Sequence, residues 1–175
     1  MNRSVTFLIA LVAVVVSVPV FAASTATATL NVTASVSTVC TISTTPVAFG
    51  AYDPVVANNT TGADIDAQGT VVVACTKNAA NVWIDLNGGG HAAGTAFGTR
   101  AMNGPGAAGV ELLGYDLFKD AGRSTVWSTG QNTGGVQYAP ASKAAFTETV
   151  YGRLFKGQDI SAGAYADAVT ATINY

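Results

Sequence analysis

Apolar and polar residues alternate along much of the chain, and a period of two is typical of half-buried β-strands. Each alternating run is short and ends at a cluster of glycine or asparagine, and no useful length of the chain shows the spacing of an amphipathic helix. The pattern predicts an all-β sandwich or barrel, with residues 88–109 and 128–135 as surface loops and a last strand that reaches the final residue. The expected inward-facing residues are Val71, Val73 and Cys75; Val82, Ile84 and Leu86; Leu113, Tyr115 and Leu117; Val150, Gly152 and Leu154; and Val169, Ala171, Ile173 and Tyr175.

The longest alternating run lies near the N-terminus, in residues 23–36, which we call the arm. Its threonine, serine and asparagine residues alternate with an apolar stripe that consists of Ala26, Ala28, Leu30, Val32, Ala34 and Val36. A run of this length is long for one strand, and its threonine content favours extended backbone. The pattern fits two structures: the first strand of the domain's own sheet, or a strand given to another molecule whose sheet it completes.

The first 22 residues have the three parts of a secretory signal peptide. Arg3 is the positive residue, residues 7–16 are an unbroken apolar run, and Val20 and Ala22 are the small residues before a cleavage site. The alternative is a membrane anchor, but a spanning helix needs about 20 apolar residues and Pro19 shortens this one. We therefore expect residues 1–22 to be removed and the mature protein to lie outside the cytoplasm.

The composition narrows the classes of protein that the chain can belong to. Only 10% of the residues are charged, the net charge is −2, and His91 is the single histidine. Nucleic-acid binding requires a basic face, so we expect no nucleic-acid partner. The scarcity of chemically reactive side chains also counts against most enzymes.

Two cysteines, Cys40 and Cys75, remain after removal of the signal peptide. In an oxidising compartment we expect a disulfide between them. On the chain-entropy model, the closed loop would stabilise the folded state by about 3–4 kcal/mol. The alternative, a thiol or zinc site, has a poor ligand set in two cysteines and one distant histidine. We predict the disulfide.

Other groups of polar or aromatic residues do not form a convincing site. Residues 88–91, Gly-Gly-Gly-His, lack the Gly-Lys-Ser/Thr continuation of a phosphate-binding loop. Asp64 and Asp66 supply too few oxygens for calcium, and nothing marks either of the two glutamates as catalytic. Trp83 and Trp127 fit a core or an interface better than a sugar platform. We expect no catalytic residue, no metal site and no cofactor.

The order of several short motifs makes the chain similar to a known family. From residue 37 to the C-terminus it resembles the spore coat protein U domain family, which includes pilin subunits of the archaic, Csu-type chaperone–usher pili. The motifs that carry the resemblance are Cys40-Thr41-Ile42, Val47-Ala48-Phe49-Gly50, Tyr52-Asp53-Pro54, residues 71–76, Arg100-Ala101-Met102, residues 113–118 with Asp120, Gly157-Gln158, residues 162–167 and residues 169–175. Ala164 and Ala168 depart from the pattern, where a more polar or bulkier residue is expected.

The resemblance implies an immunoglobulin-like β-sandwich of the pilin type that lacks its last strand, with an N-terminal donor-strand arm. It divides the chain into a signal peptide (residues 1–22), the donor-strand extension (residues 23–36) and the sandwich domain (residues 37–175). The apolar stripe of the arm would fill the acceptor groove of another subunit. The C-terminal strand, with Val169, Ala171, Ile173 and Tyr175, would line that groove.

The expected function is a structural subunit of an extracellular pilus, assembled by donor-strand exchange and supporting surface attachment and biofilm formation. The partners that the resemblance implies are further copies or related pilins in a head-to-tail polymer, a periplasmic chaperone and an outer-membrane usher. The subunit would pass through the periplasm to the cell surface. The alternative is a self-contained spore-coat or surface-matrix protein, in which the arm pairs within its own sheet.

Overall fold

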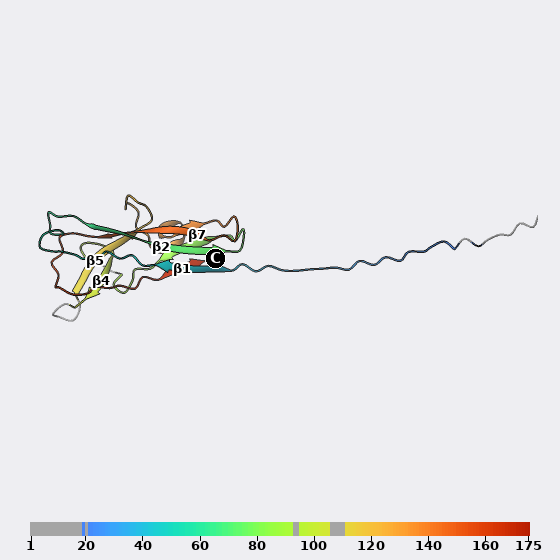
Figure 1. Cartoon of the computed structure of the whole chain (residues 1–175), viewed down its shortest axis with the longest axis horizontal. Coiled ribbons are helices and arrows are strands. Elements are labelled where there is room, and N and C mark those ends of the chain that lie inside the picture. Colours follow the sequence, from blue (N-terminus) through green and yellow to red (C-terminus); the bar gives the residue numbers. More distant parts are fainter. Residues whose placement is uncertain (1–18, 20, 93–94, 106–110) are drawn as a thin grey trace, which may run out of the picture. The chain divides into compact units, whose positions relative to one another are not determined.

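The computed structural model describes residues 19, 21–92, 95–105 and 111–175, and the chain divides into two units, Met1–Ser35 and Val36–Tyr175. In the second unit, Figure 1 shows strands joined by loops. The elements are β1 (Cys40–Thr45), β2 (Ile65–Cys75), β3 (Val82–Leu86), β4 (Arg100–Gly104), β5 (Glu111–Phe118), the single π-helical turn η1 (Gly130–Gly134), β6 (Val136–Tyr138), β7 (Phe146–Leu154) and β8 (Ala171–Asn174).

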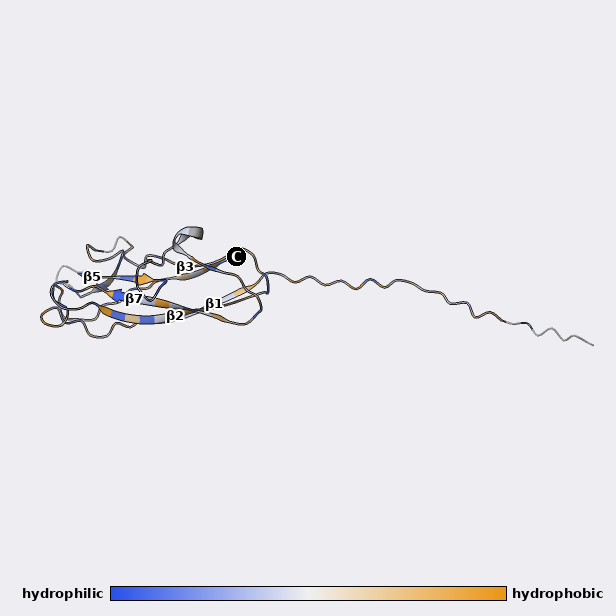
Figure 2. Ribbon diagram, turned by 90° about the horizontal axis from the view of Figure 1, so that it is seen from above, coloured by the Kyte–Doolittle hydropathy of each residue, from blue (hydrophilic) through white to orange (hydrophobic). Residues whose placement is uncertain are grey.

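The strands form two antiparallel sheets. One has the order β1-β2-β7-β5-β4 and the other the order β6-β3-β8. Figure 2 shows them as two layers, with β3 in one and β2 and β7 in the other. This arrangement confirms the predicted all-β sandwich.

The predicted alternation produces the core between the layers. In β2, Val71 and Val73 are each 1% exposed, while Val72 between them is only partly buried. Ile84 from the opposite sheet and Trp127 are both fully buried, and the indole Nε1 of Trp127 donates to the Ile84 carbonyl oxygen at 2.9 Å. Since β-branched side chains pack well on a pleated surface, this core holds the two sheets face to face.

The disulfide prediction is confirmed. Cys40 and Cys75 are bonded, and they are also cross-strand partners in the ladder between β1 and β2. The covalent bond therefore fixes the start of β1 to the end of β2.

Two boundaries differ from the prediction. Strand β4 lies inside the stretch 88–109 that was expected to be a loop, because Arg100 pairs with Tyr115 and its guanidinium is buried under carbonyl oxygens. The sequence Arg-Ala-Met-Asn-Gly has no clear alternation, so the pattern gave no sign of this strand. The last strand is also shorter than expected and ends at Asn174.

The arm contains no strand. Residues 21–39 have no regular secondary structure, and the stripe residues Leu30, Val32 and Val36 are 86%, 86% and 85% exposed. The predicted signal peptide falls almost entirely on residues 1–18 and 20, which lie outside the described residues.

Candidate binding groove

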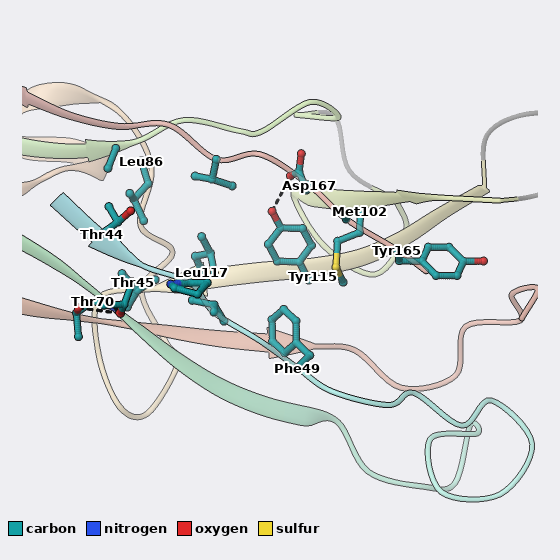
Figure 3. A pocket seen from close by; sticks show the side chains of 16 residues that line it. Thr44, Thr45, Phe49, Thr70, Leu86, Met102, Tyr115, Leu117, Tyr165 and Asp167 are labelled. Atoms are coloured by element: carbon teal, nitrogen blue, oxygen red, sulfur yellow. Dashed lines mark hydrogen bonds between the residues drawn. The ribbon is translucent and has the colours of Figure 1, made fainter. Parts of the chain in front are cut away.

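A long apolar groove opens between the edges of the two sheets. One wall is the end of β1 and the segment that follows it, residues 44–49, and the other is the segment 165–171 that leads into β8. The cavity between them has a volume of 340 Å³ (Figure 3). Its floor is the core itself, since Leu86, Leu117 and Val150 line it. A strand laid in this groove would cover core residues.

A second cavity of 840 Å³ continues the first toward the end of the sandwich where β2 begins and β7 ends. It is lined by residues 47–52, Pro54, Val55 and residues 160–165, with Met102, Leu113 and Leu154 from the sheet. Both cavities share the lining residues Val47, Phe49, Met102 and Tyr165. The groove therefore runs along the segment from Ile160 to Ala171.

The strands on both sides of the groove have an unused edge. Among the described residues, β1 pairs with β2 alone and β8 pairs with β3 alone. An unpaired edge presents backbone N–H and C=O groups that can accept a further strand. The groove thus offers an apolar floor together with backbone hydrogen-bonding groups.

Two glycines give the walls room. A Cβ at Gly152 in β7 would lie 2.7 Å from Cγ1 of Val47 and 2.8 Å from Cζ of Phe49. A Cβ at Gly104 in β4 would overlap the ring of Tyr165. These side chains can lie flat on the sheet only because the glycines have no side chain.

One polar contact interrupts the apolar floor. The hydroxyl of Tyr115 donates to Oδ2 of Asp167 at 2.6 Å, midway between the threonine-lined end and Tyr165 (Figure 3). The other carboxylate oxygen of Asp167 accepts from the backbone N–H groups of Gly90 at 2.7 Å and Ala168 at 2.8 Å. Burial raises the pKa of Tyr115 far above its usual range, and the Asp167 carboxylate adds to this shift. The phenol is therefore neutral and holds the groove wall by hydrogen bonding.

A second tyrosine fastens the far part of the same wall. The Tyr165 hydroxyl donates to Oε2 of Glu111 at 2.8 Å, and the Ser161 backbone N–H donates to the same oxygen at 2.9 Å. The Ser161 bond, followed by the Tyr165 bond, lowers the pKa of Glu111, while desolvation and Glu111 raise the pKa of Tyr165 to about 12. Glu111 thus fixes the segment 161–165 to β5.

Of the four residues predicted to line the groove, two line the first cavity and two do not. Val169 and Ala171 line the first cavity, Ile173 pairs with Ile84 of β3, and Tyr175 is 57% exposed. The sequence prediction missed the opposite wall. The alternation of Val47 and Phe49 just after Pro46 is the signal that could have found it, because proline in a β-run indicates an edge.

The aspartates and tryptophans that were considered as calcium or sugar sites lie in ion pairs and in the core, respectively. Asp66 accepts from Nε of Arg153 at 2.9 Å and lies 3.1 Å from Nε of Arg123, and Asp64 also faces Arg153. Trp127 is fully buried, and Trp83 is 6% exposed. No helix within the described ranges is long and apolar enough to cross a membrane.

The chain belongs to the spore coat protein U domain family, since the model of that family matches residues 26–172. It is 34% identical over 158 residues to "Protein U" of Myxococcus xanthus, with 87% of each protein covered. Among solved structures, a chain from the complex of the CsuC chaperone with the CsuE tip adhesion subunit of Acinetobacter baumannii Csu pili aligns with a TM-score of 0.46 and 21% identity. The alignment covers 79% of this chain and 40% of that one.

Proposed function

We propose that the protein is a non-enzymatic structural subunit of an extracellular pilus, in which the arm of one copy fills the groove of the next. The observation that carries the proposal is the apolar groove between two unpaired strand edges, in a chain whose own arm has an exposed apolar stripe. The stripe covers eleven positions, about 36 Å when extended, and the wall from Ile160 to Ala171 has a similar number of residues. Burial of Leu30 or Val32 would contribute about 1.5–3 kcal/mol each.

Two wider expectations follow from the same geometry. A contact between the arm of one copy and the groove of another is head-to-tail, so repeated contacts give a filament rather than a closed ring. An open groove is also a liability during export, because unpaired edges aggregate. We therefore include a periplasmic chaperone in the proposal. The resemblance to Csu-type pilins adds an outer-membrane usher, related pilins as partners and surface attachment with biofilm formation. The predicted signal peptide supplies the export route.

Deletion of residues 23–34 tests the proposal. The shortened chain keeps the groove and loses all but the last member of the stripe. We expect it to be exported and to bind a chaperone without forming filaments, as judged by electron microscopy of the cell surface. Filaments of normal length from the deletion variant would contradict the exchange of arms. A purified, chaperone-free chain that unfolds cooperatively as a monomer would instead favour the self-contained coat protein.

A further inference from the structure

Two adjacent valines project from the loop at the far end of the groove. Val55 is 77% exposed and Val56 is 71% exposed, and Val55 also lines the second cavity. We call this pair the valine platform. Single exposed apolar residues are ordinary, but this pair continues directly from the apolar groove.

The loop that carries the valine platform is held in place by polar contacts. Oδ1 of Asp53 accepts from the backbone N–H groups of Val55 at 2.9 Å and Val56 at 3.1 Å. Asn58, 5% exposed, accepts at Oδ1 from the Asp53 N–H and donates from Nδ2 to the Ala63 carbonyl. A partner that binds the platform would lose little free energy in ordering it.

A matching apolar pair lies at the other end of the sandwich, where the arm ends. Val36 is 85% exposed and Val39 is 56% exposed. The Thr76 hydroxyl contacts the backbone here: it accepts from the Val39 N–H at 3.0 Å and lies 3.2 Å from the Ser37 carbonyl oxygen. We call residues 36–39 with Thr76 the base.

The short connection between stripe and base limits where the donor body can lie. Thr76 holds the backbone from Ser37 onward, one residue after Val36, the last member of the stripe. One extended residue spans at most about 3.6 Å. A body whose Val36 occupies the groove of another copy must therefore lie directly against the end of that groove.

The direction of the arm decides which end this is. The two walls run in opposite directions, so a strand in the groove is antiparallel to one and parallel to the other. Residues 160–174 contain no proline, whereas Pro46 and Pro54 interrupt the other wall and cannot donate to a ladder. The arm therefore pairs best with residues 160–174, in the more stable antiparallel direction. In that direction the start of the stripe lies near Ala171, and Val36 lies near Ile160, in the cavity that Val55 also lines. The base of the donor then meets the valine platform of the acceptor.

We propose that the valine platform is the docking surface for the base of the next copy of this chain. The inference rests on the proposed exchange of arms and adds a second contact between the bodies of neighbouring subunits. Val36 and Val39 of one copy cover Val55 and Val56 of the other. This contact limits the angle between successive subunits and slows their separation.

Photo-crosslinking in filaments of the full chain tests the contact. Val56 is replaced by benzoylphenylalanine, and Ala121, in an exposed turn, by the same residue as the control. We expect a ladder of crosslinked multimers from the Val56 probe alone, with the crosslink mapped by mass spectrometry to residues 36–39 or to Thr76. Filaments without that ladder, or crosslinks to another region, overturn the docking surface and leave the exchange of arms standing. Failure of the unaltered chain to form filaments overturns both proposals.

A second measurement uses the rate at which filaments come apart. The double variant Val55→Ser/Val56→Ser keeps the loop contacts of Asp53 and Asn58, and Ala121→Ser is the control. We expect filaments of the double variant to release subunits in denaturant about tenfold faster than the control, a change equivalent to about 1.4 kcal/mol. Equal release rates for the two variants contradict the docking surface.

Discussion

Strand β2 and the arm have the same alternating pattern, but only one of them is a strand. Strand β2 has eleven residues, pairs with β1 and β7 and buries Val71 and Val73 to 1% exposure. The arm keeps its alternation over eleven positions, yet Leu30 and Val32 remain 86% exposed. Alternation therefore records that a segment is suited to a sheet and does not say whose sheet it joins.

The difference lies in what each segment has beside it. Strand β2 finds neighbours on both sides within its own unit, whereas the edges of β1 and β8 that face the groove have no partner among the described residues. In the proposed function, the stripe fills the groove that these unpaired edges border. Substitutions in β2 are therefore expected to change stability, and substitutions in the arm are expected to change filament assembly.

A charge in the core is expected to have the largest effect on stability. A charge on the stripe of the arm is expected to have the largest effect on filament assembly. Val73→Asp puts a carboxylate into the core, and we expect a loss of more than about 4 kcal/mol in the free energy of unfolding, seen as insoluble protein or loss of the urea transition. Leu30→Asp lies on an exposed residue, so unfolding should change by less than about 0.5 kcal/mol while filaments disappear.

The matched control for the arm is Asn31→Asp, which adds the same charge to the other face of the arm. We expect filaments from this variant in electron micrographs. If Leu30→Asp and Asn31→Asp assemble equally well, the stripe does not enter a groove and the comparison with β2 fails.

The disulfide gives the next largest effect. It ties β1, one wall of the groove, to the fully paired β2. We expect Cys40→Ala/Cys75→Ala to lower the free energy of unfolding by about 3–4 kcal/mol in urea titrations. The unaltered chain under reducing conditions should show the same loss. An unchanged urea midpoint for the double variant contradicts the role of the bond in holding the wall.

The sequence predicted the inward residues of β2 and β7 from a regular alternation, and those of β3 and β5 as well. It did not predict that residues on the other face of β3 and β5, such as Trp83 and Asp116, are also buried. It predicted the disulfide from compartment and cysteine number. It missed β4, because Arg100 is stabilised there by carbonyl oxygens from distant segments, Leu86 and Trp127. The groove wall at Val47 and Phe49 was also missed, since its position depends on the long-range contact with Gly152. Such contacts are set by the tertiary fold and leave little local pattern.

The polar contact in the groove floor has a smaller expected effect. Tyr115→Phe removes the hydroxyl that bonds to Asp167 at 2.6 Å and keeps the ring that lines the first cavity. We expect a loss of about 1–3 kcal/mol, because a carboxylate oxygen is left without its donor. Urea unfolding measures the loss, and Tyr151→Phe, on the outer face of β7, is the control. An unchanged midpoint for Tyr115→Phe would mean that Asp167 finds water instead.

The smallest effect is expected from the titration of Glu111. Its pKa is lowered in the folded chain, first by the Ser161 N–H and then by the Tyr165 hydroxyl, so its stabilising contribution is present at neutral pH and is lost as the pH falls through the folded-state pKa. As the pH falls through this lowered pKa, we expect hydrogen exchange to accelerate more in residues 161–166 than in β2. Glu111→Gln should remove this pH dependence, because an amide does not titrate. Equal acceleration in both variants would place the pH-sensitive group elsewhere, and the groove wall would then share the uniform acid response of strand β2.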